Sequence, residues 1–523
     1  MNSHAESGAA STETGARREG RVPLRVWVER AIVAWLFVLA LSAPHSIAAT
    51  QIAWGVGMLL WVLRLTLRPR PKTYRTPLDY ALLGFFILTG LSAFLSYEPF
   101  VSIGKLRAAS LFTIVYLVAE NVPSRRTLRA LALTLIASCT INVVYTLVQR
   151  VIGRGVKLEN LSKASPLYLA GVREGNTVLE VDGQSVRSPE ALVQALTASS
   201  ANAAVPLPSA TAQLKVYGSE IYWNFQMPRG SLLEGKTALE RLGVGSWSRG
   251  RDWRAAGFYG HYVTYAESLQ LIASLALGIL IVLPRKRSWP GILLLLATVG
   301  FGLALIWTVT RASWLALLIS ACLMVLIGAS RRTLLLIMLS LLLLVPAGLY
   351  LLQQKRNVGF FDQKDESIKW RQTVWREGAR LLVSKSRHLL VGVGMDSLKA
   401  HWREWGLFDQ GRLPVGHMHS NLLQLAVERG LPALFVWLIL LGIYGRVLWR
   451  LAHEHEIGGW LERGIALGAL GGLAGFFVSG LVHYNWGDSE VIMIFYFIMG
   501  LCLIIERERI VHKSSVSSMA RLD

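Results

Sequence analysis

Long apolar stretches alternate with polar connections along most of this chain, and that alternation is its dominant pattern. The stretches lie at about residues 28–43, 47–65, 78–96, 101–119, 128–148, 262–283, 290–309, 312–329, 333–352, 431–449, 462–482 and 489–505. A helix needs roughly 20 mainly apolar residues to cross the hydrocarbon layer of a bilayer, and these stretches approach that length. The pattern therefore predicts an all-α polytopic membrane protein with about 12 transmembrane helices.

Positive charge is concentrated in alternate connections, which orients the predicted helices. Basic residues retained on the cytoplasmic side fix the topology of short connections, whereas long segments cross regardless of charge. Both termini are therefore expected in the cytoplasm, and the two long segments, at about 150–261 and 353–430, on the outer face. The basic clusters of the inner connections are Arg17–Arg30, Arg68–Arg75, Arg125–Arg129, Arg285–Arg287, Arg331–Arg332 and Arg446–Arg450.

Composition supports this class and excludes others. The chain has 523 residues, of which 53% are hydrophobic, and a formal net charge of +21. Such a charge could indicate nucleic-acid binding, but the basic residues fall between apolar stretches, so membrane topology accounts for them and no nucleic-acid partner is expected. The three cysteines, Cys139, Cys322 and Cys502, lie inside apolar stretches, which leaves no disulfide framework or cysteine-based zinc site.

The first long outer segment changes from apolar to mixed character. It contains Ser165-Pro166, Ala170-Gly171, Asp182-Gly183, a strand-like Val178–Val181 and a helix-like Pro189–Leu196. In these features it resembles a PDZ domain of the protease-associated type. Only about ten polar residues separate the fifth apolar stretch from Ser165, which leaves little room for a full first strand. A structural or docking role and the capture of a peptide C-terminus are both open for this insert.

These boundaries divide the chain into seven parts. We expect a disordered cytoplasmic tail (1–27), transmembrane helices 1–5 (28–150), a small α+β PDZ-like insert (158–232), helices 6–9 (251–352), a large helical outer loop carrying the catalytic residues (353–430), helices 10–12 (431–505) and a second cytoplasmic tail (506–523).

Two histidines at the end of the second outer segment are the strongest candidates for chemistry. Ser420 or Asn421 can cap a helix that closes at Gly430 and Pro432, so His417 and His419 lie just before its N-terminus. The positive field of a helix N-terminus disfavours a second proton on an imidazole. A neutral imidazole can accept a proton from an attacking hydroxyl, which makes this loop a candidate active site.

Arginines in outer connections are candidates for binding an anion. Arg311 sits in a turn of a few residues between two apolar helices, where a cation is costly without an anionic partner. Residues near Arg371 and Arg376 have the spacing of an amphipathic helix, which we expect to lie on the outer membrane surface. Arg254 precedes the sixth helix at the outer face.

The last outer connection brings further ionisable groups to the same face. It contains His483, Asp488 and Glu490, and either Asp488 or Ser489 can cap the final helix. No HExxH motif occurs in an apolar stretch, so an intramembrane metalloprotease is excluded. A secondary transporter is disfavoured as well, because no pair of repeats with helix-breaking residues at midspan is evident.

Three residue sets carry a resemblance to a known family. They are Thr308–Arg311 with Leu315, Arg371 with Trp375 and the Gly392–Gly394 turn, and His417–His419 with Asn421, Leu423, Glu428 and Gly430. In their order and placement they resemble the O-antigen ligase and O-antigen polymerase family of bacterial inner-membrane glycosyltransferases. The resemblance implies a multi-pass protein of the inner membrane with its active site at the periplasmic face.

The same resemblance implies roles for individual residues. His419 is expected to act as the base, with His417 as the alternative, and Arg311 and Arg371 to grip a lipid diphosphate. Neither a metal nor a cofactor is expected. The secondary candidates are His417, Arg254, Arg376, Glu428, Asp488 and Glu490.

The partners that follow are an undecaprenyl-diphosphate-linked glycan donor, a lipid A core or glycan acceptor, membrane lipids and a protein partner of the insert. Ligase activity, with a lipid A core as acceptor, is favoured over polymerase activity and over protein glycosylation. A membrane-tethered PDZ scaffold without chemistry is the alternative from another class.

Overall fold

A computed structural model describes residues 23–198, 211–218, 221–328, 366–454 and 459–519. Within these ranges nine helices are long and apolar enough to cross a membrane. Every predicted apolar stretch except 333–352, which lies outside the described residues, coincides with helical structure. The chain is thus a multi-pass membrane protein, while the number of twelve spans stays a prediction.

The helical bundle is built from two groups of helices, one before and one after the insert in the sequence. The first group is α1 (Leu24–Ser42), α2 (Ile47–Thr66), α3 (Asp79–Phe94), the broken segment α4 (Pro99–Gly104), α5 (Leu106–Ala109), η1 (Ser110–Phe112) and α6 (Thr113–Asn121), and α7 (Arg125–Ile152). The second is η3 (Gly257–Tyr259), α11 (Tyr262–Val282), α12 (Trp289–Trp307), α13 (Arg311–Gly328), α18 (Asn421–His453), α19 (Trp460–Gly480), η4 (Asn485–Gly487) and α20 (Ser489–Met519).

Both predicted tails need correction at their inner boundaries. Helix α1 begins at Leu24, so the predicted tail 1–27 includes its first turn. Helix α20 continues to Met519 through most of the predicted tail 506–523. Charge pairs account for this extension, because Arg509 contacts Glu506 at 2.8 Å and Glu454 at 3.0 Å beyond the apolar part of the helix.

The insert is a six-stranded antiparallel sheet with its own hydrophobic core. Its order is β5-β4-β2-β1-β6, with β3 paired to β2. The elements are β1 (Arg154–Leu161), α8 (Pro166–Leu169), β2 (Thr177–Val181), β3 (Gln184–Ser185), α9 (Pro189–Thr197), β4 (Thr211–Gly218), β5 (Ile221–Pro228), α10 (Ala238–Leu242) and β6 (Val244–Gly250).

Two expectations about the insert change. The sheet extends from Arg154 to Gly250, beyond the predicted range 158–232 at both ends. There is also room for a complete first strand: α7 ends at Ile152 and Gly153, with a φ of 80°, turns the chain directly into β1. Whether the insert is a PDZ domain stays a prediction.

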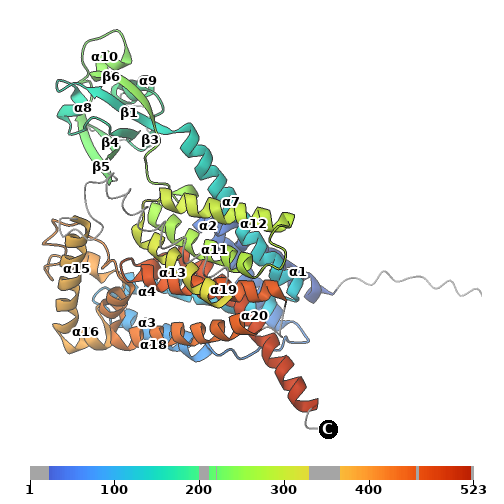
Figure 1. Cartoon of the computed structure of the whole chain (residues 1–523). Helices are drawn as coiled ribbons and strands as arrows, with labels where there is room; N and C mark the ends of the chain where they lie inside the picture. Colours follow the sequence, from blue (N-terminus) through green and yellow to red (C-terminus); the bar gives the residue numbers. More distant parts are fainter. Residues whose placement is uncertain (1–22, 199–210, 219–220, 329–365, 455–458, 520–523) are drawn as a thin grey trace, which may run out of the picture.

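The sheet unit is attached to the bundle by packed side chains. Leu179 and Tyr217 of the sheet belong to the hydrophobic core of the bundle. The backbone N–H of Ala255 donates to the carbonyl of Trp307, at the end of α12, across 2.8 Å. The insert is therefore docked beside the turn that leads to Arg311, as Figure 1 shows for the sheet above α7 and α12.

Helices α11 and α19 pack unusually closely because small residues line their contact. A Cβ added at Gly278 would lie 2.2 Å from the backbone nitrogen of Gly468. Such small residues allow two backbones to approach in a membrane, where van der Waals packing holds helices together. The two helices are antiparallel, so the same contact brings the start of α11 beside the end of α19.

Helix α18 is broken at Gly430, which has a φ of 83°, and Pro432 follows. Pro432 has no N–H to give the carbonyl of Glu428, which instead accepts from Gly394 N at 2.9 Å and Ser92 Oγ at 2.7 Å. The break thereby docks the Gly392–Gly394 turn and α3 against α18.

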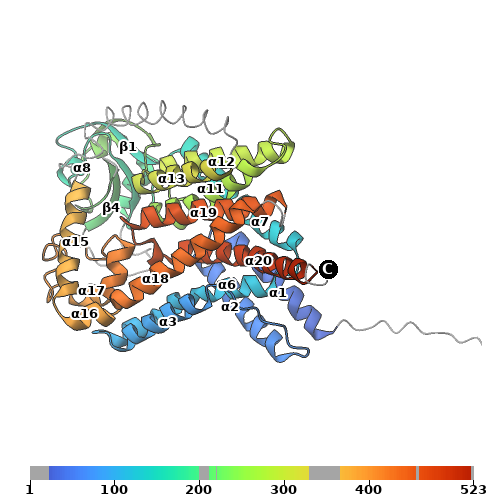
Figure 2. The same ribbon diagram turned by 60° about the horizontal axis from the view of Figure 1, so that its bottom comes forward.

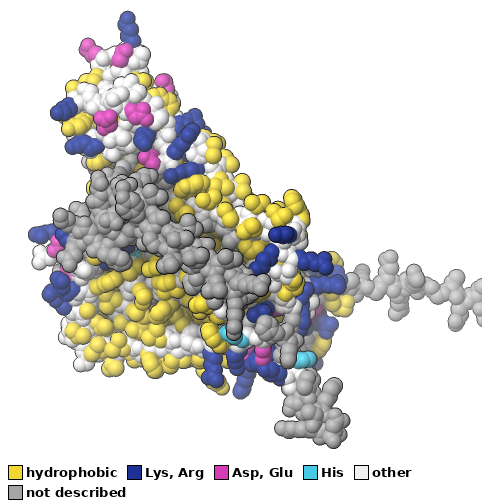
Figure 3. All heavy atoms as spheres, in the orientation of Figure 1, with side chains coloured by type: hydrophobic (Ala, Val, Ile, Leu, Met, Phe, Trp, Pro, Cys, Tyr) yellow, Lys and Arg dark blue, Asp and Glu magenta, His cyan; other side chains and the backbone are white. Residues whose placement is uncertain are grey.

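The short helices of the second outer segment gather at one end of the bundle. In Figures 1 and 2, α15 (Glu366–Val383), α16 (Ser386–Val391) and α17 (Ser397–His401) lie at one end of α3 and α18, and the C-terminus leaves at the other. Figure 3 shows hydrophobic side chains across the face of the bundle, as expected for a lipid-facing surface.

Candidate active site

Residues His417–Ser420, which we call the histidine loop, directly precede α18 and are held in place by hydrogen bonds. Ser420, one of the two residues predicted as a cap, occupies the N-cap position, but its side chain makes no capping bond. Instead the Met418 N–H donates to Oε1 of Gln424, in the first turn of α18, across 2.6 Å. His419 has a φ of 48°, a left-handed conformation that side chains rarely adopt and that is most common at functional sites.

The two imidazoles lie in contact with tilted planes, and each ring also contacts an aromatic side chain. Their ring centroids are 4.0 Å apart, with Trp370 at 4.3 Å from His419 and Tyr484 at 5.7 Å from His417. The His419 N–H donates to Nδ1 of His417 across 3.2 Å. Neither ring nitrogen of His419 has a hydrogen-bond partner among the described residues. Its ring therefore has a nitrogen free to accept a proton from a substrate.

Burial keeps both imidazoles neutral. Desolvation, reinforced by the charge of Lys399, lowers the pKa of His417 to about 4. Desolvation also lowers the pKa of His419, to about 2, with additional contributions from His417, Arg371 and His483. A neutral His419 at ordinary pH has the protonation state required of a general base.

Helix α15 brings Arg371 to this loop but leaves Arg376 away from it. Trp375 Nε1 donates to the Met418 carbonyl across 2.9 Å, which fixes α15 against the histidine loop. The Arg371 guanidinium lies 5.8 Å from the Trp370 ring, and its charge reaches His419. Arg376 is exposed on another face of the helix.

The expectation that α15 lies on the membrane surface needs correction. Its apolar residues Val374 and Leu381 are buried in a cluster with Met418 and Val427. The apolar face of this amphipathic helix is therefore covered by the protein itself, which places its polar residues around the site.

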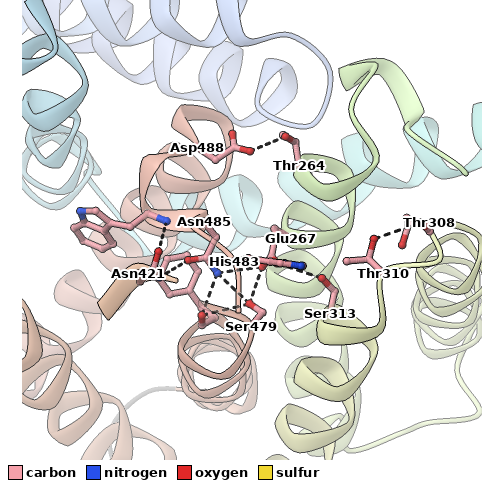
Figure 4. Close-up of polar contacts among 12 residues, drawn as sticks. Thr264, Glu267, Thr308, Thr310, Ser313, Asn421, Ser479, His483, Asn485 and Asp488 are labelled. Atoms are coloured by element: carbon pink, nitrogen blue, oxygen red, sulfur yellow. Dashed lines mark hydrogen bonds and ion pairs between the residues drawn. The ribbon is translucent and has the colours of Figure 1, made fainter. Parts of the chain in front are cut away.

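Arg311 begins α13, and the first turn of this helix is connected to the start of α18 by a buried polar network (Figure 4). Ser313, in the same first turn of α13, donates to Glu267 of α11 across 3.2 Å. Glu267 also accepts from Asn485, which in turn bonds Asn421, the first residue of α18. This network joins the starts of α13 and α18, where Arg311 is two residues from Ser313 and His419 is two residues from Asn421.

The structure places the secondary candidates in three groups. Glu428 is buried and accepts from Asp396 N at 2.9 Å and Tyr484 OH at 3.4 Å, so it braces the histidine site from behind. Asp488 accepts from Thr264 Oγ1 at 2.6 Å, and Glu490 lies close to it at the start of α20. Arg254 stacks on Tyr262 at 4.4 Å, at the junction with the insert.

Sequence reasoning missed Glu267, which is at the centre of this network. It is an acidic residue inside an apolar stretch, and such residues mark functional or paired sites because an isolated charge there is costly. That signal was available in the sequence. Its partners were not, because they come from segments more than 40 residues away.

The described residues contain no group of three or more His, Cys, Asp or Glu side chains that could hold a metal ion. Among the described residues, the site offers a neutral imidazole without a ring hydrogen bond, a second imidazole in contact with it and a guanidinium near it. This set can accept a proton next to a developing negative charge.

In the comparison with known protein families, one segment of the chain matches a family model. Residues 293–438 match the family model described as O-antigen ligase. No curated protein matches the chain significantly. The matched segment contains Arg311, Arg371, His417 and His419 together with most of α12, all of α13 and the break in α18. Over this segment, the chain is similar to the O-antigen ligase family.

Proposed function

We propose that this protein transfers a glycan from undecaprenyl diphosphate to an acceptor hydroxyl at the periplasmic face of the bacterial inner membrane, as an O-antigen ligase with a lipid A core as acceptor. The family implies transfer of the O-antigen type. The observation that carries the proposal is the pair of neutral imidazoles near Arg371 within the matched segment, where no described residue makes a hydrogen bond to the His419 ring.

The reaction requires one proton acceptor and one site for negative charge. A hydroxyl of the acceptor gives its proton to a ring nitrogen of His419, and its oxygen bonds the anomeric carbon of the glycan. The bond from that carbon to the diphosphate breaks, and its electron pair leaves on the diphosphate oxygen. The products are the glycosylated acceptor and undecaprenyl diphosphate, so atoms and charge balance.

Arg311 and Arg371 stabilise the departing diphosphate in this scheme. A guanidinium forms bidentate hydrogen bonds with phosphate oxygens and keeps its charge at all relevant pH values. Fixed cations at the position where charge develops lower the barrier without reorganisation. The positive charge is supplied by protein side chains, so the scheme uses no metal ion.

The orientation of the chain follows from the same scheme. Both chain ends are cytoplasmic, and the end of the bundle that carries α15–α17 and the sheet faces the periplasm. The arrangement in Figure 2, with this end opposite the C-terminus, supports that orientation. A cysteine introduced at exposed Arg403 should react with a membrane-impermeant maleimide added to intact spheroplasts, and one at exposed Ile510 should not.

The test is complementation of bacterial strains that lack either the ligase or the polymerase. We expect the wild-type chain to restore long lipopolysaccharide in the ligase-deficient strain, and His419→Ala and Arg311→Ala to fail at normal abundance. Restoration in the polymerase-deficient strain alone would instead assign polymerase activity. Full activity of the His419→Ala protein would remove the proposed base.

A further inference from the structure

A buried carboxylate and imidazole form the centre of the polar network behind the site. Glu267 is 1% exposed and His483 is 7% exposed. His483 Nδ1 donates to Oε1 of Glu267 across 2.7 Å. Taking such a charge out of water costs several kcal/mol per ion unless partners replace the lost hydration, and isolated charges at membrane depth are correspondingly rare.

Each of the two carboxylate oxygens of Glu267 accepts two hydrogen bonds, and the donors come from several segments of the fold. Oε1 accepts from Ser313 of α13 at 3.2 Å as well as from His483. Oε2 accepts from Ser479 of α19 at 2.7 Å and from Asn485 of η4 at 3.1 Å. Four donors on one carboxylate leave no oxygen available for a substrate, so Glu267 does not enter the reaction itself.

The network ends at both parts of the site. On one side, Ser313 is two residues from Arg311. On the other, Asn485 bonds Asn421, whose Oδ1 accepts from the Trp486 N–H across 3.1 Å, and Asn421 is two residues from His419. Figure 4 shows the members of this network converging from different elements: Glu267 of α11, Ser313 of α13, Asn421 of α18, Ser479 of α19 and Asn485 of η4.

We propose that Glu267 and His483 are positioning residues, which fix the starts of α13 and α18 relative to each other and so hold Arg311 and His419 in register for glycan transfer. This inference rests on the proposed function. A carboxylate suits the task because it only accepts hydrogen bonds, whereas an amide would present its N–H₂ group to two of the four donors. Misplacing reacting groups by about 1 Å can cost on the order of 100-fold in rate.

A matched control exists on the opposite side of the bundle. Glu462 is also buried, at 0% exposure, and is paired with Arg129 at 2.7 Å. It lies on α19 with Ser479, but 17 residues earlier, which is about 25 Å along a helix. Glu462→Gln thus removes a buried charge without touching the starts of α13 and α18.

The experiment measures initial rates in proteoliposomes with purified lipid-linked donor and rough lipopolysaccharide, per folded molecule. We expect Glu267→Gln and His483→Ala to lower kcat by about 10- to 100-fold. The thermal midpoint should fall no further than in Glu462→Gln, whose kcat should stay within about twofold of wild type. His483→Asn keeps a donor near the position of Nδ1, so it should recover kcat to within about threefold.

The outcomes separate this inference from the proposed function. If wild type transfers glycan and His419→Ala does not, the proposed function stands. Wild-type kcat in Glu267→Gln would then overturn the positioning role alone, as would a defect in His483→Asn equal to that of His483→Ala. A wild-type protein without transfer activity would instead reject the proposed function.

Discussion

The backbone N–H of His419 donates to Nδ1 of His417 across 3.2 Å, and this hydrogen bond distinguishes the two neighbouring imidazoles, because it occupies a ring nitrogen of His417 only. A neutral histidine whose Nδ1 accepts must carry its proton on Nε2. His417 is therefore held in one tautomer and supports the left-handed turn at His419. No described residue makes a hydrogen bond to the His419 ring, which favours His419 over His417 as the proposed base.

Substitution of the two histidines should distinguish their roles. His419→Ala should lower kcat by at least about 100-fold, because general bases contribute on the order of 10²–10⁴. His417→Ala should have a smaller effect, and His417→Asn should be milder still, because its Oδ1 can accept from the His419 N–H. Steady-state rates in proteoliposomes measure this. An Asn variant at 417 as inactive as His419→Ala would reverse the assignment.

Acid should destabilise the site without first protonating the base. Burial depresses the pKa of His417 to about 4 in the folded protein, against about 6.5 when unfolded. As pH falls from about 6.5 toward 4, His417 becomes protonated in the unfolded chain but stays neutral in the folded chain. The free energy of unfolding that is present above pH 6.5 therefore decreases. The thermal midpoint should fall by a few degrees between pH 7 and pH 5.

Activity should respond differently over the same range. Since the pKa of His419 is lowered further still, kcat should remain near its neutral value at pH 5.5. A rate that halves near pH 6.5 would show that the base is a solvated histidine elsewhere. His417→Gln should flatten the pH dependence of the thermal midpoint, which serves as the control.

Arg371 and Arg376 provide a matched pair on one helix. Arg371 lies beside Trp370 at the histidine loop, and Arg376 is exposed. Lysine at 371 keeps the charge but loses the bidentate geometry. Arg371→Lys should therefore raise the KM for the lipid-linked donor and lower kcat by about 10-fold or more, whereas Arg376→Lys should change neither. If the two substitutions have equal effects, Arg371 does not bind the donor diphosphate and contributes only a surface charge.

The sequence predicts the helices well because their signal is local. Apolar length alone locates α2, α7 and α11, and the breakers Gly430 and Pro432 locate the end of the first part of α18. The N-terminal placement of His419 follows from the same local pattern. These features need no information about neighbours in space.

The other parts of the site depend on contacts between distant segments. The partners of Glu267 come from α13, α19 and η4, and nothing in the spacing of Ser313, Ser479 and Asn485 indicates that they meet. From the sequence, the apolar face of α15 is suited to contact with lipid, but in the structure it packs against Val427 and Met418. In the insert, β6 lies far beyond the motif that identifies the sheet, so its pairing with β1 was not predictable.

The break in α18 should be sensitive to the size of a single residue. Gly430 has a φ of 83°, and a Cβ there would lie 2.3 Å from the carbonyl oxygen of Leu390. Gly430→Ala should lower the thermal midpoint, because the left-handed conformation alone costs about 1–3 kcal/mol for a residue with a side chain. It should also lower activity, because the Gly392–Gly394 turn is bonded to α18 at this break.

Gly442 is the control for this substitution on the same helix. It has nothing within 4 Å of its Cβ position, and alanine is favoured over glycine inside a helix by roughly 1 kcal/mol. Gly442→Ala should therefore leave the thermal midpoint unchanged or slightly raised, with normal transfer rates. If Gly430→Ala behaves like Gly442→Ala, α18 is continuous, and the Gly392–Gly394 turn must be held against it in another way.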